Sequence, residues 1–125
     1  MHTNAFATHL NVLVNKIMPT VSIAFQIMPK THSPDDAIRL IERAIEIVKQ
    51  SGISYEVGAM ETVMEEERIE ELLAIVKRTH DACLAAGAES VFINVKILSN
   101  PNGIMSIHEK IAPHRPSTRP DEPKN

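Results

Sequence analysis

Six side chains in this sequence have types and spacing suited to binding a small molecule. They are two amides, a carboxylate, a hydroxyl and two groups that can pack against a flat ring: Gln26, Asn94, Glu56, Thr62, Met60 and Phe92. A carboxamide carries a donor and an acceptor side by side, and a carboxylate accepts hydrogen bonds or attracts a cation. Methionine adapts its shape to an apolar partner, and phenylalanine offers a flat face. We expect these residues to form a ligand-binding site that contains no catalytic residue.

Each of these residues also has a simpler interpretation. The polar ones are typical of a solvated strand face, and Met60 and Met64 are typical of ordinary packing or of a subunit interface. The side on which Thr62 lies depends on strand parity. If the hairpin before it contains a bulge, Glu61 and Val63 replace Thr62 on the uncovered face of the sheet.

Other chemistry finds little support in the sequence. His80 and Cys83 are spaced like a metal pair, but no further ligand has a matching spacing, so we expect a core-edge histidine, a core cysteine and no metal site. Nucleophile motifs, a P-loop and GxGxxG are absent. We therefore expect no enzymatic activity and no cofactor. A small enzyme with Glu56 or Glu61 as general base is a remote alternative.

Composition excludes several classes of protein. The chain has 125 residues, a net charge of −3 and 3% aromatic residues, which argues against a nucleic-acid partner. It holds 1 cysteine, which cannot form an internal disulfide and is typical of a reducing cytosol. No apolar run approaches the roughly 20 residues of a membrane-spanning helix. We expect a soluble cytoplasmic protein that has no membrane partner.

Composition along the chain predicts one folded domain between two extensions. Met18 precedes the first clearly patterned segment, so residues 1–18 are expected to be an N-terminal extension without fixed structure. The domain is expected over 19–112. The proline-rich tail at 113–125 has too few apolar residues to order itself.

Hydrophobic periodicity predicts the elements that position the six residues. Apolar residues at every second position indicate strands, and apolar residues three or four apart indicate helices. Ser33 and Pro34 start the first helix, Gly52 ends it, and Ser106 with Glu109 forms a capping box for the last. The predicted strands are 20–28, 53–57, 60–65 and 90–98, and the predicted helices are 34–51, 66–86 and 107–112.

This order of elements is that of a ferredoxin-like α+β sandwich, with four antiparallel strands and two helices on one face. The second helix is expected to point one stripe of side chains inward: Ile69, Leu72, Leu73, Val76, Cys83 and Leu84. The alternate strand rows containing Gln26, Glu56 and Asn94 are then expected on the uncovered face. Phe92 and Met28 on that face predict burial by a ligand or by another subunit.

The segment YEVGAMETVMEEE at 55–67, the strand VFINVKI at 91–97 and SIHEKI at 106–111 resemble the thiamine-binding family of small ferredoxin-like proteins. Glu56, Gly58 and Thr62 match the family's hairpin pattern. Ala59, where members often have proline, and Glu66, where they often have glycine, depart from it and affect the turn geometry.

The resemblance implies a non-catalytic protein that binds thiamine or its hydroxymethylpyrimidine half as a homodimer or a dimer of dimers. The six residues suit that ligand, since amides can read an aminopyrimidine edge and Glu56 can attract a thiazolium cation. An oligomeric interaction or regulatory module without a small-molecule ligand is the alternative function.

Overall fold

The computed structural model describes residues 18–116, and the predictions made for 1–17 and 117–125 lie outside these residues. Four strands and two long helices follow one another in the order predicted, and a short helix and a 3-10 turn come last. Their bounds are β1 Val21–Lys30, α2 Pro34–Gln50, β2 Ser54–Val57, β3 Thr62–Glu66, α3 Ile69–Ala85, β4 Ser90–Ser99, α4 Ile107–Ile111 and η1 Ala112–His114.

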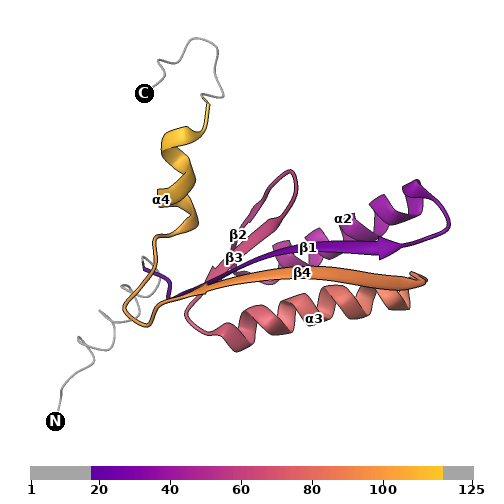
Figure 1. The fold of residues 1–125 in the computed structure, drawn as a ribbon, viewed down its shortest axis with the longest axis horizontal. Coiled ribbons are helices and arrows are strands. Elements are labelled where there is room, and N and C mark those ends of the chain that lie inside the picture. The colour runs from indigo at the N-terminus through magenta and orange to yellow at the C-terminus, as the bar shows by residue number, and fades with distance from the viewer. Residues whose placement is uncertain (1–17, 117–125) are drawn as a thin grey trace.

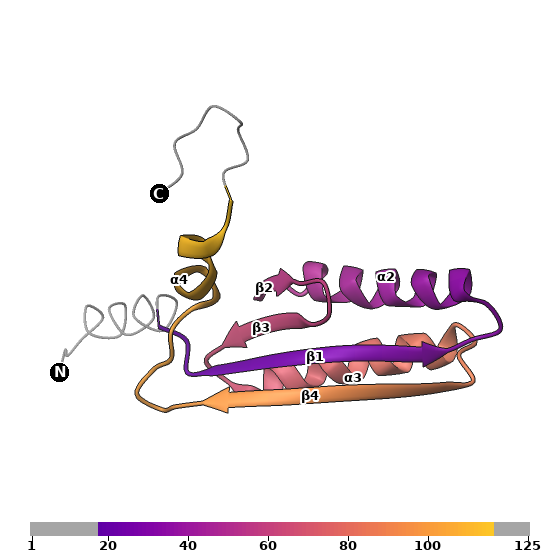
Figure 2. The same ribbon diagram turned by 45° about the horizontal axis from the view of Figure 1, so that its top comes forward.

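The sheet is antiparallel with the strand order β2-β3-β1-β4, so the chain has the predicted ferredoxin-like fold. The helices α2 and α3 lie together on one side of the sheet (Figures 1 and 2). We call the opposite side the open face. None of the helices within 18–116 is both long enough and apolar enough to cross a lipid bilayer.

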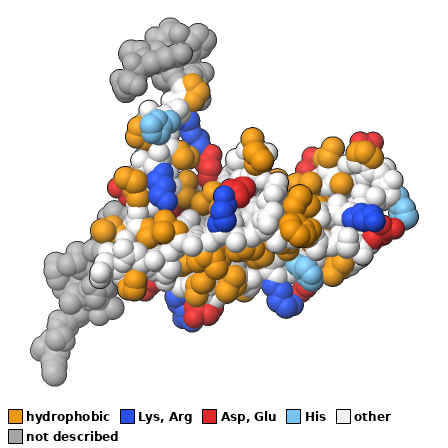
Figure 3. All heavy atoms as spheres, viewed as in Figure 1, with side chains coloured by type: hydrophobic (Ala, Val, Ile, Leu, Met, Phe, Trp, Pro, Cys, Tyr) orange, Lys and Arg blue, Asp and Glu red, His pale blue; other side chains and the backbone are white. Residues whose placement is uncertain are grey.

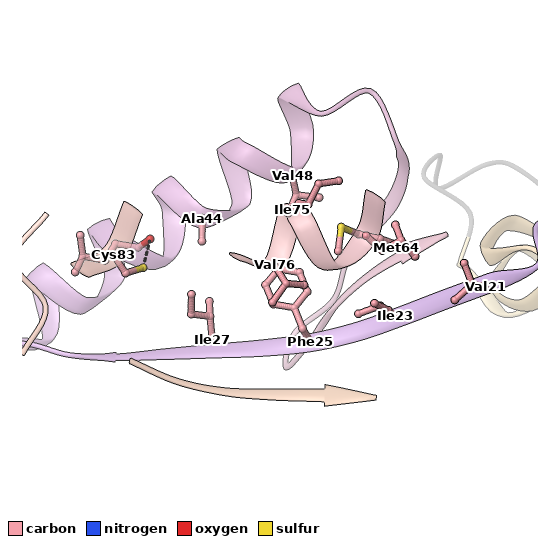
Figure 4. Close-up of a cluster of buried hydrophobic side chains, with 12 residues drawn as sticks. Val21, Ile23, Phe25, Ile27, Ala44, Val48, Met64, Ile75, Val76 and Cys83 are labelled. Atoms are coloured by element: carbon pink, nitrogen blue, oxygen red, sulfur yellow. Dashed lines mark hydrogen bonds between the residues drawn. The ribbon is translucent and has the colours of Figure 1, made fainter. Parts of the chain in front are cut away.

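The core lies between the sheet and the two long helices. Val21, Ile23, Phe25 and Ile27 project from β1 toward the helices, because alternate strand residues point to the same face (Figure 4). They pack against buried side chains of β3, α2 and α3: Met64, Leu40, Ala44, Val48, Leu72, Ile75, Val76 and Cys83. The alternation predicted for β1 is therefore confirmed.

The strand β1 is longer than predicted, and this shapes the sheet. It pairs with β4 from Val21 to Lys30, beyond the predicted end at Pro29. On its other side β1 pairs with β3 only from Val21 to Phe25. Figure 2 shows the short β2–β3 hairpin beside only the first part of β1. Within the described residues, the second half of β1 therefore has one strand neighbour instead of two.

The inward stripe of α3 is partly corrected by the structure. Leu72, Val76 and Cys83 are buried as predicted, but Leu73 and Leu84 are each 43% exposed. Ile75 and Thr79 are buried in addition. The buried face of α3 is thus rotated relative to the prediction. The reason is that α3 packs against both the sheet and α2, so its buried side chains are those that point between these two neighbours.

The C-terminal elements are ordered further than predicted. Ser106 caps α4, with its hydroxyl accepting from the Glu109 N–H at 3.1 Å, while the Glu109 carboxylate accepts from the Ser106 N–H at 3.1 Å. The predicted capping box is confirmed. Residues 112–114 continue as a 3-10 turn, where a tail without fixed structure was predicted to begin at 113. Arg115 then reaches the sheet, as described below.

Candidate functional site

The register of the strands places Gln26 and Asn94 opposite each other on the open face. The Asn94 Nδ2 atom donates to Gln26 Oε1 at 3.5 Å. Phe92 lies two residues before Asn94 on β4, opposite Met28, and it is 60% exposed. The structure thus brings three of the six predicted site residues together along the β1–β4 pair.

Glu56 lies on the open face as predicted, but it lies apart from the two amides. It belongs to a row that crosses all four strands, in the order Glu56, Val63, Ala24 and Lys96. Gln26 is one row further along and two strands away, roughly 10 Å across the sheet. The Glu56 carboxylate forms an ion pair with the Arg115 guanidinium.

The prediction that Thr62 lies on the open face is wrong. Thr62 pairs with Phe25, a core residue of β1, and only 9% of its surface is exposed. The alternative parity holds instead, and Val63 stands on the open face opposite Ala24. The physical reason is the register of the hairpin: Glu56 pairs with Val63 and Val57 with Thr62, so Thr62 shares the face of Val57 rather than that of Glu56. The loop between the strands spans 58–61 and is closed by the Gly58 N–H donating to the Glu61 carbonyl at 2.9 Å.

Met60 lies in that loop rather than on a strand, and it is 76% exposed. The third strand begins at Thr62, two residues later than predicted. Glycine at 58 permits this loop, because a Cβ there would lie 2.9 Å from the Glu61 carbonyl oxygen. The loop therefore brings Met60 toward the end of the hairpin.

A hollow of about 260 Å³ lies where the hairpin stops short of β1. We call it the hairpin notch. It is bounded by the loop and its flanking residues, by α2 and by the part of β1 that lacks a β3 partner. Its lining includes Gln26, Ile27, Ile41, Ile45, Met60 and Thr62. Three of the predicted site residues thus share one hollow, although Gln26 and Thr62 project to opposite faces of the sheet.

A second hollow, of about 310 Å³, lies on the open face beneath α4. We call it the open-face pocket. Small residues of β1 form its floor, and its walls include Glu56, Lys96, Ile107 and Ile111. The carboxylate of Glu65 holds α4 over it by accepting from the Ile107 N–H at 2.8 Å. Among the six predicted residues, Glu56 alone lines this pocket.

An ion pair links the two hollows. Lys96 lines the open-face pocket and Glu61 lines the hairpin notch, and the Lys96 Nζ atom lies 2.9 Å from a Glu61 carboxylate oxygen. The lysine side chain reaches from β4 across β1 to make this contact. The carboxylate at the notch therefore has a partly exposed ammonium group as its partner.

Several lining residues were not identified from the sequence. Ile41 and Ile45 recur at the helical spacing of a buried face, and Ile27 belongs to the apolar alternation of β1, so their types do not distinguish them from core residues. Lys96 is a charged residue of a strand and carries no further signal. The signal that could have located them is the unequal length of the strands, since a five-residue strand cannot cover a ten-residue neighbour.

The residues with weaker claims to chemistry have structural surroundings. Cys83 is buried, with Sγ 3.8 Å from the Leu40 carbonyl, and burial raises the pKa of its thiol. His80 is half-buried and its Nδ1 lies 2.9 Å from Asp81. Within residues 18–116, no three His, Cys, Asp or Glu side chains are grouped closely enough to hold a metal ion.

Figure 3 shows hydrophobic side chains in a band along β4 and beside α3, with charged groups at its borders. Exposed apolar side chains of the open face include Met28, Phe92 and Leu98, which are 40%, 60% and 50% exposed. Surface of this kind is typical of a face that another molecule covers.

Comparison with known proteins gives a consistent result. The sequence profile described as thiamine-binding protein matches residues 23–115. A UPF0045 protein of Clostridium perfringens is 34% identical over 98 residues, which cover 78% of this chain and all of that protein. A UPF0045 protein of Methanothermobacter thermautotrophicus is 31% identical over 71 residues, which cover 57% of this chain and 72% of that protein.

Solved structures show the same similarity. A DUF77 domain of unknown function from Bacillus cereus superimposes with a TM-score of 0.69 and 40% identity, covering 78% of this chain and 92% of that one. A structure from Thermotoga maritima, described as a "putative thiamine biosynthesis/salvage protein", superimposes with a TM-score of 0.67 and 29% identity. That comparison covers 78% of this chain and 100% of the Thermotoga chain.

Proposed function

Because this chain belongs to the thiamine-binding protein family, we propose that it binds thiamine or its hydroxymethylpyrimidine moiety in the hairpin notch and catalyses no reaction. A role in thiamine salvage, transport or homeostasis would follow. The observation that carries this proposal is the location of the family-like hairpin segment. The residues from Val57 to Thr62 form one wall of the notch, opposite Gln26.

The notch suits a flat, neutral heterocycle. Its walls are mostly aliphatic, from Ile27, Ile41 and Ile45, and such groups pack well against the faces of a ring. The Gln26 amide and the Thr62 hydroxyl add hydrogen-bonding groups at its edge. Met60, on the exposed loop, can adapt its thioether to whatever the notch contains. This combination of apolar walls and few polar groups is typical of small-molecule sites.

The cationic half of thiamine needs a different environment. Its thiazolium ring carries a fixed positive charge, which a nearby carboxylate would stabilise. Glu61 is the ionisable side chain among the described residues that line the notch, and its side chain is 31% exposed. The thiazolium ring would therefore lie toward solvent near Glu61, while the aminopyrimidine ring occupies the apolar part of the notch.

The small number of ionisable groups at the notch supports binding without catalysis. Acid-base chemistry needs one group that gives a proton and one that takes it, placed around the reacting atoms. The described lining of the notch contains a single carboxylate, which forms an ion pair with Lys96, and no second group that could exchange a proton with it around a ligand. The alternative with Glu56 as general base loses support as well, since Glu56 is paired with Arg115 outside the notch.

Titration calorimetry with thiamine and with hydroxymethylpyrimidine tests the proposal. We expect heat of binding and a raised thermal midpoint, because a ligand that binds only the folded state stabilises it. Ile41→Trp should fill the notch and abolish binding. Ile38→Trp is the matched control, since Ile38 lies on the same helix, is 53% exposed and does not line the notch. Absence of heat from both ligands at millimolar concentration would refute the proposal.

The exposed apolar residues of the open face favour self-association as a second property. We propose a homodimer or dimer of dimers in which Phe92, 60% exposed, contacts another subunit. Phe92→Glu should then yield monomers in sedimentation velocity, whereas Leu84→Glu on the outer side of α3 should not. Loss of assembly together with a complete absence of ligand binding by the wild type would favour the interaction module instead.

A further inference from the structure

The free edge of β1 presents main-chain groups to the hairpin notch. The pairing of β1 with β3 ends at Phe25 and Thr62, while its pairing with β4 continues to Lys30. Within residues 18–116, the side of β1 that faces the notch therefore has no strand partner after Phe25. Ile27 lies in this free part of the strand and lines the notch.

The direction of the Ile27 peptide groups follows from alternation along the strand. The Lys30 carbonyl points toward β4, because it accepts from the Glu89 N–H at 2.8 Å. Successive residues of a strand direct their N–H and C=O groups to opposite sides, so those of Ile27 and Pro29 point away from β4. Proline has no N–H. Ile27 is thus the residue of this free edge that offers both a donor and an acceptor to the notch.

We propose that the N–H and C=O groups of Ile27 recognise the 4-aminopyrimidine edge of the ligand, as a neighbouring strand would. This inference rests on the proposed function. The ring nitrogen beside the amino group would accept from the Ile27 N–H, and the exocyclic amino group would donate to the Ile27 carbonyl. The ligand class is therefore a pyrimidine with an acceptor and a donor on adjacent positions.

The shape of the notch agrees with this mode of binding. A flat ring that pairs with a strand edge lies close to the plane of the sheet, in the place that a longer β3 would occupy. One face of the ring would then contact the isoleucines of α2, Ile41 and Ile45, which line the same hollow. The hairpin loop would close the far side. The Gln26 amide remains available for other polar atoms of the ring.

Recognition by one donor and one acceptor is sensitive to their order. Oxythiamine replaces the 4-amino group of thiamine by an oxygen and places a proton on the adjacent ring nitrogen, so donor and acceptor exchange places. Both of its groups would then face a like group of Ile27. A site that leaves polar groups unpaired discriminates strongly. We expect oxythiamine to bind at least about tenfold more weakly than thiamine.

Calorimetry with thiamine and oxythiamine tests the order of the groups. Thiamine binding at least tenfold tighter supports the proposal, and equal affinity overturns it. Cytosine, a 4-amino-pyrimidin-2-one, carries the same acceptor and donor on adjacent ring positions. Binding of cytosine that reproduces the Ile27 signature described next would support edge recognition and identify a nucleobase as the ligand source.

Nuclear magnetic resonance of the ¹⁵N-labelled full chain locates the contact. Neutral hydroxymethylpyrimidine should shift the Ile27 amide downfield and slow its hydrogen exchange, while the Phe25 amide, inside the β1–β3 pairing, serves as the control. Replacing Ile27 by its α-hydroxy acid keeps the side chain, removes the N–H and should weaken binding about tenfold. Measurable heat of binding with an unchanged Ile27 amide would overturn this inference and leave the proposed function standing. Absence of heat from thiamine and hydroxymethylpyrimidine would overturn both.

Discussion

Asn94 donates from Nδ2 to the Oε1 atom of Gln26 across the β1–β4 pair, yet Gln26 alone of the two lines the hairpin notch. The contact is long, at 3.5 Å, so it adds little to the stability of the sheet. We propose that Asn94 acts on a ligand in the notch through Gln26, as a positioning residue.

The first prediction follows from this relationship. Gln26→Ala should weaken hydroxymethylpyrimidine binding about tenfold, the effect of one lost hydrogen bond, and Asn94→Ala by about threefold or less. The double variant should match Gln26→Ala, because Asn94 contributes only through its partner. Calorimetry on the four proteins completes the cycle. Independent, additive losses would contradict this account and give Asn94 its own ligand contact.

Thr62 can be tested by a substitution that preserves its volume. Thr62→Val removes the hydroxyl but keeps the packing against Phe25, so the thermal midpoint should stay the same or rise, while ligand affinity falls about three- to tenfold. Thr79→Val is the control for affinity: Thr79, on α3, is also buried and does not line the notch, although its hydroxyl donates to the Val76 carbonyl, so this variant should lose stability and keep its affinity. Unchanged affinity of the Thr62 variant would remove its hydroxyl from the site.

The Lys96–Glu61 pair should discriminate between charged and neutral ligands. Lys96→Gln removes an ammonium group beside the proposed position of the thiazolium ring, so thiamine should bind about two- to fivefold more tightly. Neutral hydroxymethylpyrimidine should bind as before, and Lys110→Gln, at the open-face pocket, should alter neither. The gain should shrink as salt is added. An equal gain in affinity for both ligands would show that the shorter side chain, and not the lost charge, causes the change.

The hairpin loop can be disturbed selectively at its glycine. In Gly58→Ala the new Cβ would meet the Glu61 carbonyl oxygen at 2.9 Å, so the loop must shift and ligand affinity should fall. Gly52→Ala provides the comparison. Gly52 has φ +79 and open space around it, so alanine there should cost about 1 kcal/mol of stability and leave ligand affinity unchanged. Binding data and thermal melts on both variants separate the two effects.

The attachment of α4 should depend on acidity. The hydrogen bond from the Ser106 N–H lowers the pKa of Glu109 below its ordinary value of 4.5. A carboxyl group with a lowered pKa contributes stability above its ordinary pKa, and the contribution is lost as the pH falls through the lowered value. The protection of the α4 amides, expressed as the ratio of intrinsic to observed exchange rate, should therefore fall below about pH 4.5 in the wild type and depend less on pH in Glu109→Gln.

The fold was predictable because its signals are local. Period-two alternation in β1, the Ser33 cap of α2 and the Ser106–Glu109 capping box each depend on a few neighbouring residues, and each is found as predicted. Parity beyond the hairpin was not predictable in this way. It depends on which residues of β2 and β3 stand opposite each other, and Val57 stands opposite Thr62 while Glu56 stands opposite Val63.

The site was harder to predict than the fold because it arises where β1 continues without a neighbouring strand. No residue type marks the place where β3 ends beside a continuing β1, and the notch exists only because of that mismatch. Gln26 was identified by its chemistry, whereas Ile41 and Ile45 resemble any other core residue of a helix. Glu56 was assigned to the correct face, but its separation from Gln26 follows from strand order, which periodicity does not encode.

The proline in β1 has a consequence for how these molecules behave when crowded. Pairing with β4 at Pro29 leaves its nitrogen on the opposite side of the strand, where a donor would otherwise be. A foreign chain that approached this edge could exchange two hydrogen bonds at Ile27 but would find an acceptor and no donor at Pro29, the next matching position. The missing donor disfavours strand addition at this edge, which lowers the tendency of neighbouring molecules to join edge to edge.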